Sequence, residues 1–288
     1  MKVLITGSNG QLGSELIDRY LDRDNDSVFA GDLPDLDITS QESVSELFAE
    51  VMPDVVINCA AWTAVDSAEE KETAAFAVNA EGPAILANEC ARIGARLIHL
   101  STDYVFEGNA TEPYQENDHA EPVTAYGRTK LAGEKYVQEI LPDNHLIVRT
   151  AWLYGVNGEN FVKTIIRALE QRDVLTVVTD QVGQPTFAGD LADQIVALID
   201  VPGASGIFHA TNSGVASWFE FARQIMVEIN QDPERILPTD SSSFVRPAPR
   251  PPYSVLGHER WADVGMAPMR DWRLALHEAI ADIVPSED

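Results

Sequence analysis

Lys2-Val-Leu-Ile-Thr-Gly-Ser-Asn-Gly-Gln-Leu-Gly13 decides the fold of this chain, because a short apolar run leads directly into a turn with three glycines. Residues 14–21 follow with helical spacing, so the expected order is strand, glycine turn, helix. Glycine permits a tight turn and close approach of the backbone to a ligand, and the first N–H groups of a helix bind pyrophosphate. The Gly-x-x-Gly-x-x-Gly spacing is a variant of the dinucleotide fingerprint and predicts a nucleotide-binding unit.

The same alternation continues outward from this unit. Strands that alternate with helices imply parallel βαβ units, so we expect an α/β fold with a Rossmann-type doubly wound parallel sheet. A capping-box pattern at Thr39-Ser-Gln-Glu42 predicts the start of the second helix. The expected strands are 2–6, 27–30, 55–58, 96–100 and 146–150, and the expected helices are 14–21, 39–52, 75–79, 83–93 and 126–140.

Strict alternation fades after residue 152. We therefore expect an NAD(P)-binding Rossmann domain over residues 1–152 and a smaller α/β substrate-binding lobe over 153–288, with some segments returning to pack on the Rossmann domain. In the lobe we expect helices at 160–170, 190–199, 217–229 and 273–283, a strand at 174–178, and a turn-rich segment at 238–253.

Composition limits the classes of function. The net charge of −26 argues against nonspecific nucleic-acid binding, which needs clustered positive charge. No apolar run approaches the ~20 residues that span a bilayer, and we expect no signal peptide. The two cysteines, Cys59 and Cys90, form neither a disulfide framework nor a zinc site, so we expect a cytoplasmic protein. From the charge and the apolar runs we expect no nucleic-acid or membrane partners. The charge fits an ordinary acidic surface or adaptation to a salty cytosol equally well.

Tyr126-Gly-Arg-Thr-Lys130 carries the expected chemistry. Residues four apart share a helix face, so the Tyr126 phenol and the Lys130 ammonium would lie side by side. A nearby cation lowers the pKa of a phenol from about 10 and makes it a better acid. Thr102 lies just after an expected strand, from where its hydroxyl could bond the oxygen that Tyr126 protonates. The set suits hydride transfer to or from a carbonyl; the alternative is a Tyr and a Lys on an ordinary helix surface.

Asp32 and the strand ends predict the rest of a cofactor site. An acidic residue about 20 residues after the last glycine binds the adenosine ribose, and Asp32 lies there. Its charge should repel a 2′-phosphate and favour NADH over NADPH, unless it is only a solvated turn residue. Gly7, Ala60 and Thr102 come just after three expected strands and should converge on one edge of the sheet.

Several stretches spread over most of the chain carry a family resemblance: 7–13, 58–66, Ser101-Thr-Asp-Tyr-Val-Phe106, Tyr126-Gly-Arg-Thr-Lys-Leu-Ala-Gly-Glu134, 149–154, 160–161 and Asp180-Gln-Val-Gly-Gln-Pro-Thr186. With them the chain resembles the extended short-chain dehydrogenase/reductase superfamily, and within it the dTDP-4-dehydrorhamnose reductase family. The resemblance implies reduction of the C4 keto group of dTDP-4-dehydro-β-L-rhamnose to give dTDP-L-rhamnose. The family usually uses NADPH and often accepts NADH, so the implied cofactor is NADPH or NADH.

The resemblance also implies a role for each matched residue. Tyr126 would protonate the sugar C4 oxygen, Lys130 would bind the nicotinamide ribose and tune Tyr126, and Thr102 would polarise the carbonyl. Asp103 and Trp152 would contact the sugar. The implied cofactor-binding residues are Gly7, Asn9, Gly10, Gln11, Leu12, Asp32, Asp37, Ile38, Ala61, Trp62, Thr63, Tyr126 and Lys130.

Arginines in the proline-rich segment 246–253 are candidates for the phosphates of the substrate. A nucleotide diphosphate is dianionic, so an acidic protein needs a local basic patch to bind it. Arg246 and Arg250 are the first candidates, with Lys163 and Arg167 behind them. Surface solubility or a structural ion pair is the alternative role for the arginines.

One departure from the family concerns a metal. Some members dimerise through Mg²⁺ held by glutamates, one early in the first helix and one just after the Pro-Thr motif. Glu15 fits the first position, but Gly189, with Asp190 beside it, occupies the second. We therefore name no metal-binding residues, and the sequence does not favour a metal-linked dimer, while bound Mg²⁺ and a homodimer both stay open.

Two other functions stay open at this stage. The motifs barely separate this activity from that of a reductase of another dTDP-4-keto-deoxysugar, because sugar specificity lies in loops. Relatives also serve as a noncatalytic regulatory subunit of methionine adenosyltransferase, although the intact Thr102, Tyr126 and Lys130 argue against that role. A dehydratase would usually carry an Asp-Glu pair after the threonine, whereas Asp103-Tyr104 follows Thr102 here.

Overall fold

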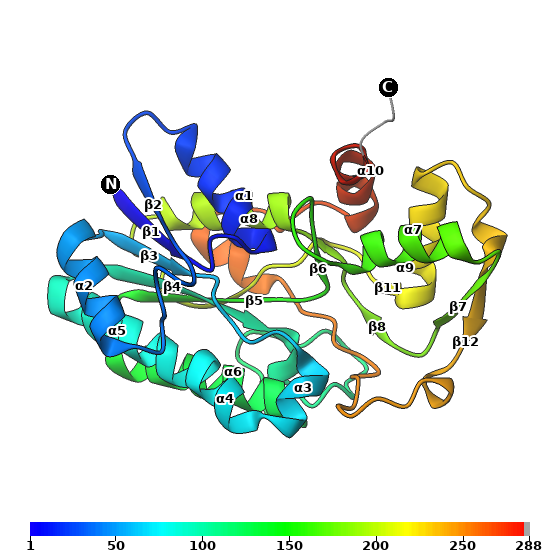
Figure 1. Cartoon of the computed structure of the whole chain (residues 1–288), viewed down its shortest axis with the longest axis horizontal. Helices are drawn as coiled ribbons and strands as arrows, with labels where there is room; N and C mark the ends of the chain where they lie inside the picture. Colours follow the sequence, from blue (N-terminus) through cyan, green and yellow to red (C-terminus); the bar gives the residue numbers. More distant parts are fainter. Residues whose placement is uncertain (285–288) are drawn as a thin grey trace.

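A parallel sheet with helices on both faces forms the larger part of the molecule, as the computed structural model shows (Figure 1). The structure describes residues 1–284. The strand order is β10-β5-β4-β3-β1-β2 and every pair is parallel, which confirms the predicted Rossmann-type fold. β2 lies on one side of β1, whereas β3 and the later strands lie on the other side. The ligand crevice of such a sheet lies at this change of direction, beyond the carboxyl ends of β1 and β3. The strands are β1 (Lys2–Thr6), β2 (Ser27–Gly31), β3 (Val55–Asn58), β4 (Arg96–Thr102), β5 (His145–Thr150) and β10 (Gly206–His209).

The strands are mainly apolar because helices cover both faces of the sheet. Side chains alternate across a strand, so Val3 and Ile5 enter the core on one face while Leu4 enters the core on the other. The helices α1 and α8 lie on one face, and α2, α5 and α6 lie on the opposite face (Figure 1). Their bounds are α1 (Gln11–Leu21), α2 (Gln41–Val51), α5 (Gly82–Ile93), α6 (Ala125–Ile140) and α8 (Ala188–Ile199).

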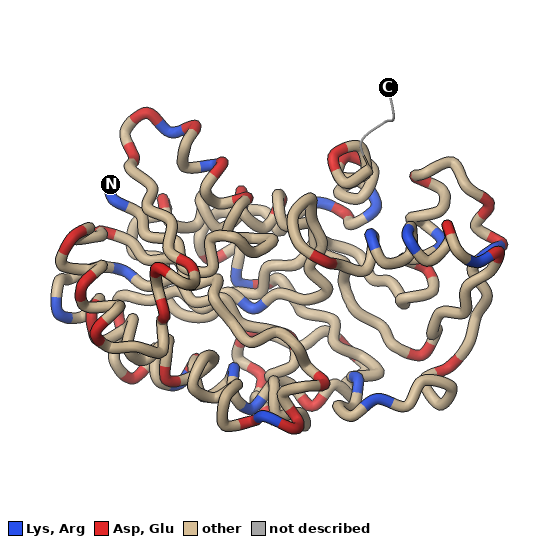
Figure 2. Tube along the Cα trace, viewed as in Figure 1, with Lys and Arg blue, Asp and Glu red and all other residues tan. Residues whose placement is uncertain are grey.

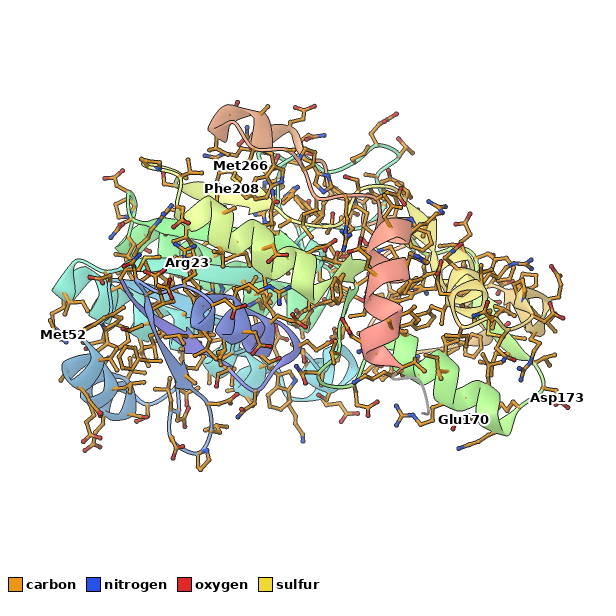
Figure 3. The ribbon with its side chains drawn as sticks, turned by 90° about the horizontal axis from the view of Figure 1, so that it is seen from above. Arg23, Met52, Glu170, Asp173, Phe208 and Met266 are labelled. Carbon is orange, nitrogen blue, oxygen red and sulfur yellow. The ribbon has the colours of Figure 1, made fainter. Side chains whose placement is uncertain are left out.

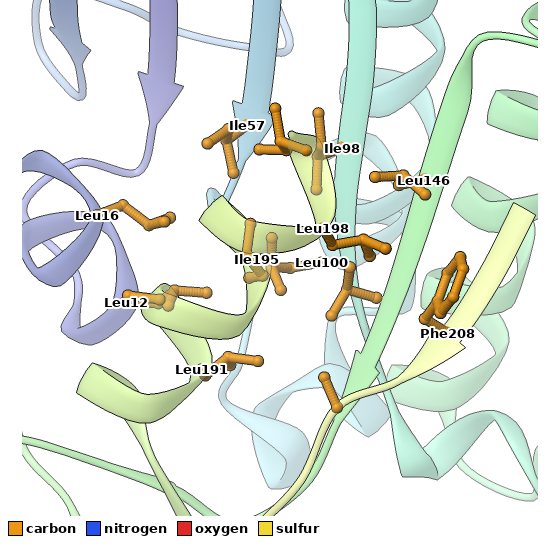
Figure 4. Close-up of a cluster of buried hydrophobic side chains, with 14 of the residues drawn as sticks. Leu12, Leu16, Ile57, Ile98, Leu100, Leu146, Leu191, Ile195, Leu198 and Phe208 are labelled. Carbon is orange, nitrogen blue, oxygen red and sulfur yellow. The ribbon is translucent and has the colours of Figure 1, made fainter. Parts of the chain in front are cut away.

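The core under α1 and α8 joins distant parts of the sequence (Figure 4). Both α8 and β10 follow residue 153 in the chain, so part of the C-terminal half returns to complete the sheet. The side chains that meet in this core are Leu12 and Leu16 of α1, Leu191, Ile195 and Leu198 of α8, and Ile57, Ile98, Leu146 and Phe208 of the sheet.

A second lobe has its own apolar core, built chiefly from α7, α9, α10, β7 and β12. Viewed from above, Met52 after α2 and Asp173 after α7 lie at opposite ends of the molecule (Figure 3). The proposed boundary at residues 152/153 stays a prediction, and residues 285–288 of the expected lobe lie outside the described residues. The elements here are β6 (Leu153–Tyr154), α7 (Phe161–Gln171), β7 (Leu175–Val178), β8 (Val182–Gly183), β9 (Thr186–Phe187), β11 (Ala216–Ser217), α9 (Trp218–Glu228), β12 (Ile236–Thr239) and α10 (Trp272–Ile283).

Several short helices and helical turns complete the secondary structure. The expected helices at 75–79 and 83–93 are continuous, because a π-helical turn, η1 (Ala77–Glu81), joins α4 (Glu72–Phe76) to α5. The predicted cap at Thr39 is wrong: Ser40 caps α2 by accepting from the Ser43 N–H. Thr39 instead donates to Asp37 Oδ1 at 2.7 Å, because that carboxylate lies two residues before it. The remaining helices are α3 (Val65–Glu70) and the 3₁₀ turns η2 (Asp103–Val105), η3 (Pro233–Arg235), η4 (Ser241–Ser243) and η5 (Glu259–Val264).

Asp and Glu residues are spread along the trace in both parts of the molecule (Figure 2). The chain has 46 Asp and Glu residues against 20 Lys and Arg. None of the helices in the described range has both the length and the apolar composition needed to cross a membrane.

Candidate active site

The glycine turn forms a cradle at the N-terminus of α1. Gly7 has a φ of +66°, a conformation that glycine adopts without strain. A Cβ on Gly13 would lie 2.2 Å from the Gly7 carbonyl oxygen, so a side chain would not fit there. Gly10 caps α1 without any side-chain hydrogen bond, which leaves the first N–H groups of the helix free for a pyrophosphate. These features fit a dinucleotide cofactor.

Asp32 is fixed at the edge of this cradle, directly after β2. Its carboxylate accepts hydrogen bonds from the Asn9 N–H at 2.9 Å and from the Leu33 N–H at 2.8 Å. Two backbone bonds hold the acid where an adenosine ribose would reach it. Asp37 lies further along the same loop, where it accepts from the Thr39 N–H at 2.9 Å.

One cleft with a volume of about 1170 Å³ connects the cradle with the second lobe. Asn9 and Trp62 are absent from its lining, although the Asn9 N–H donates to the cleft-lining Asp32. The other predicted site residues all line the cleft: Gly7, Gly10, Gln11, Leu12, Asp32, Asp37, Ile38, Ala61, Thr63, Thr102, Asp103, Tyr126, Lys130, Trp152, Arg246 and Arg250.

The start of α6 brings Tyr126 to the end of β4. Thr124 caps the helix by accepting from the Gly127 N–H at 3.0 Å, and Glu69 accepts from the Ala125 N–H at 2.8 Å. A Cβ on Gly127 would lie 2.1 Å from the Tyr104 carbonyl oxygen, so glycine allows α6 to approach the turn that follows β4. Thr102, Tyr126 and Lys130 consequently line the same cleft, as predicted from sequence.

Burial, rather than the neighbouring cation, controls the Tyr126 phenol. Burial raises the pKa of Tyr126 to about 12; the Thr102 hydroxyl opposes this shift and the Asp103 carboxylate adds to it. The expected lowering of the phenol pKa by Lys130 is therefore not found. The Lys130 ammonium instead donates to the Leu100 carbonyl oxygen at 2.5 Å. The phenol keeps its proton at neutral pH, as a proton donor must.

Lys130 is buried, and burial lowers its pKa to about 8, while the Glu134 carboxylate acts in the opposite direction. The pKa of His99 lies well below its usual value because of burial and the Lys130 charge, so this imidazole is neutral. Its Nδ1 lies 3.1 Å from Asn58 Nδ2. Lys130 is thus the cationic member of this buried group near neutral pH.

A buried ion pair behind Lys130 ties α6 to the sheet. Arg149 of β5 contacts both carboxylate oxygens of Glu134, at 2.9 and 2.7 Å. Ser101, next to Thr102 on β4, donates to the same carboxylate. No role was assigned to this pair from the sequence. The charged Arg149 within the apolar run 146–150 is nevertheless a signal for a buried partner of opposite charge.

Asn79, in the π-helical turn, holds the loop that follows β3. Its side-chain oxygen accepts from the Trp62 N–H at 2.8 Å, and its amide donates to the Trp62 carbonyl oxygen at 3.1 Å. The same amide donates to Thr129 Oγ1 at 3.1 Å, so one side chain joins this loop to α6. The Trp62 backbone therefore helps to hold this loop in place, and Trp62 itself does not line the cleft.

Two stacked tryptophans form part of the wall of the cleft. Trp152 has a φ of +46°, which is strained for a bulky residue, and its ring stacks on Trp218 with centroids 3.6 Å apart. Sequence reasoning missed Trp218, which comes from α9 in the second lobe. Asp103 also lines the cleft; burial raises the pKa of Asp103 to about 6, and the hydroxyls of Ser254 and Thr102 oppose that shift.

The predicted basic residues do not form one patch. Arg246 and Arg250 line the cleft, but both contact Asp66, at 3.6 and 2.9 Å. Lys163 donates to the backbone and Arg167 pairs with an exposed glutamate, and neither lines the cleft. Arg172, which lies in no recognised motif, does line it.

The residues at the expected metal position do not fit Mg²⁺. Glu15 is paired with Arg19 at 2.8 Å, and both oxygens of Asp190 accept from Arg270 at 2.8 Å. A Cβ on Gly189 would lie 2.5 Å from the ring of Phe187, so this position has no room for a carboxylate. Within residues 1–284 no group of three His, Cys, Asp or Glu side chains is arranged to hold a metal ion.

Comparisons with known proteins give similarity over the whole length. The RmlD substrate binding domain family matches residues 1–284. The chain is 49% identical over 289 residues to a probable dTDP-4,6-dihydroxy-2-methyloxan-3-one 4-ketoreductase of Streptomyces antibioticus, covering 100% of this chain and 97% of the relative. It is 49% identical to a dTDP-4-dehydrorhamnose reductase of Streptomyces griseus, covering 96% of this chain and 92% of the relative. The crystal structure of dTDP-4-dehydrorhamnose reductase from Bacillus anthracis in complex with NADP has 39% identity and a TM-score of 0.93, with 98% and 99% covered.

Proposed function

Because the chain belongs to the dTDP-4-dehydrorhamnose reductase family, we propose that it reduces the C4 ketone of dTDP-4-dehydro-β-L-rhamnose with NADPH or NADH, giving dTDP-L-rhamnose. The observation that carries the proposal is the convergence of Thr102, Tyr126 and Lys130 with the glycine cradle in one cleft. The cleft volume of about 1170 Å³ exceeds that of typical single-ligand pockets, which supports binding of a cofactor and a nucleotide sugar together.

The cofactor would lie along the glycine cradle. The N-terminus of α1 would hold the pyrophosphate, Asp32 the adenosine ribose, and Asp37 and Ile38 would lie against the adenine. When bound, NADPH or NADH supplies the hydride. Ala61 and Thr63 would leave the middle of the cofactor close to the backbone, and Lys130 would bind the nicotinamide ribose.

Tyr126 would supply the proton. As the hydride adds to C4, negative charge develops on the carbonyl oxygen, and the Tyr126 phenol donates its proton there to complete the hydroxyl. The Thr102 hydroxyl would bond the same oxygen and stabilise this charge. Trp152 and Asp103 would orient the sugar, so the protein supplies the orientation and the proton.

A second candidate is a reductase of another dTDP-4-keto-deoxysugar. The Streptomyces antibioticus relative, which is named for a different keto sugar, is as similar to this chain as the rhamnose enzyme of Streptomyces griseus. The intact catalytic trio and open cleft argue against a noncatalytic regulatory subunit. For the cofactor, the Bacillus anthracis structure contains NADP, whereas the charge of Asp32 favours NADH in this chain.

A cytoplasmic location agrees with the two cysteines, which are free thiols in the described chain. A homodimer, if formed, would not use the family's metal-linked contact, because the carboxylates at that position are paired with Arg19 and Arg270.

The proposal is tested by generating dTDP-4-dehydro-β-L-rhamnose in place from its precursor. Oxidation of NADPH and of NADH is then followed separately, with wild type and with Tyr126→Phe. We expect dTDP-L-rhamnose as the product and loss of turnover in the variant. A folded protein that binds cofactor but turns over neither mixture would contradict the proposal and favour another deoxysugar or a regulatory role.

A further inference from the structure

We call residues 244–250 the strap. The middle of the strap is attached to the rest of the protein chiefly through one side chain. Just before the strap, the Ser241 N–H donates to the Asp180 carboxylate at 2.9 Å. At the other end, the Tyr253 N–H donates to the Gly108 carbonyl oxygen at 2.9 Å. Two more backbone bonds lie between these points: the Phe244 N–H donates to the Ser241 carbonyl oxygen at 3.0 Å, and the Pro252 carbonyl oxygen accepts from the Val182 N–H at 2.9 Å. Over residues 245–250, the polar contacts with the rest of the described chain go to Asp66.

Asp66 makes three contacts with the strap. Its Oδ2 lies 2.9 Å from Arg250 Nη2 and 3.6 Å from Arg246 Nη1. Its Oδ1 accepts from the Ala248 N–H at 3.2 Å. These contacts lower the pKa of Asp66 against the opposing effect of its partial burial. Asp66 is therefore ionised near neutral pH and fixes both the backbone and the two arginines of the strap.

Asp66 lies in a different part of the chain from the other anchors, Asp180 and Gly108. It belongs to the first turn of α3, immediately after the loop that contains Ala61 and Thr63. Phe244, Arg246 and Arg250 line the cleft. One carboxylate thus joins the cofactor side of the site to its substrate side.

We propose that Asp66 is a positioning residue for substrate binding, which holds the strap so that Arg246 and Arg250 meet the diphosphate of the nucleotide sugar. This inference rests on the proposed function for the identity of the substrate. One carboxylate against two guanidinium groups leaves one net positive charge, so Asp66 orders the arginines without cancelling them. In a chain of net charge −26, that local cation favours approach of a dianion.

Two opposite effects of Asp66 on affinity can be separated. If ordering dominates, removing the carboxylate weakens substrate binding, because both arginines and the strap backbone lose their fixed positions. If competition dominates, removing it strengthens binding, because the arginines gain free charge. Ordering should win, since the pair is partly exposed, at 23% and 30% for Arg250 and Asp66, and solvent screens the competing charge.

The test uses Asp66→Ala, Asp66→Asn and, as a control, Glu70→Ala, which removes an exposed carboxylate from the same helix. We expect Asp66→Ala to raise KM for the nucleotide sugar about fivefold to tenfold, the loss of one partly exposed pair and one hydrogen bond. The kcat value and KM for NADPH or NADH should not change. Asp66→Asn should have a smaller effect, because its amide oxygen still accepts from the Ala248 N–H, and Glu70→Ala should match wild type.

Amide hydrogen exchange of the strap, measured without substrate, gives a second readout. Exchange of the Ala248 N–H should become faster in Asp66→Ala and stay slow in Glu70→Ala. An unchanged or lowered KM for the sugar in Asp66→Ala, or unchanged exchange, would overturn the inference. If wild type turns over no dTDP-keto-sugar, the proposed function fails, whereas the exchange comparison still tests whether Asp66 holds the strap.

Discussion

Replacing Glu134 with Gln should destabilise the protein strongly. The side chains of Glu134 and Arg149 are 1% and 3% exposed, and the guanidinium contacts both carboxylate oxygens. Glutamine keeps the shape but removes the charge, so Arg149 is left buried without its counter-charge. Removing one partner of a buried pair costs about 3–5 kcal/mol, a large part of the ~5–15 kcal/mol that typically separates folded from unfolded protein.

Urea unfolding followed by tryptophan fluorescence measures this cost, and Glu72→Gln provides a matched control. The control breaks the Glu72–Arg128 pair, whose side chains are 45% and 44% exposed, and should cost less than about 1 kcal/mol. Glu134→Gln combined with Arg149→Met should recover much of the lost stability, because no unpaired charge remains buried. A Glu134→Gln variant that is no less stable than Glu72→Gln would refute the reasoning.

Three further outcomes are expected. The kcat/KM value should fall as pH rises through about 8, because the buried Lys130 loses its proton there and with it the positive charge and one N–H donor that would hold the nicotinamide ribose; a flat profile from pH 7 to 10 would contradict this role. Asp32→Ala should raise the ratio of kcat/KM for NADPH over NADH roughly tenfold, since a carboxylate that repels the 2′-phosphate is removed, and an unchanged ratio would show that Asp32 does not select the cofactor. The Tm should rise with salt if self-repulsion from a net charge of −26 limits stability, and a flat salt series would remove the high-salt interpretation.

The features that the sequence predicted well are local or follow from sheet topology. Gly7 and Gly13 mark the turn by their spacing alone, and the apolar runs mark the strands. The meeting of Thr102 with Tyr126 follows because a parallel sheet collects its strand ends at one edge. Helix spacing also places Lys130 on the face of Tyr126, but it does not tell which carbonyl the ammonium reaches, so the expected effect on the phenol pKa was not found.

The features that were missed depend on contacts between distant segments. Asn79 and its π-helical turn have no reliable sequence signature, because the extra residue in the turn is needed only where α6 packs against it. Trp218 reaches the cleft through the second lobe, and its stacking on Trp152 follows from tertiary packing alone. Asp66 likewise meets Arg250 across a long sequence separation, which charge patterning along the chain does not predict.

Transfer of labelled hydrogen from cofactor to sugar tests the proposed reaction most directly. NADPH or NADH carrying two deuterium atoms at the nicotinamide C4 would be incubated with the protein and dTDP-4-dehydro-β-L-rhamnose in ordinary water, and the product examined by NMR. Direct hydride transfer predicts dTDP-L-rhamnose with one deuterium on the sugar C4 carbon and none at other carbons. A reduced product without deuterium at C4, or with deuterium at another carbon, would contradict the proposed chemistry.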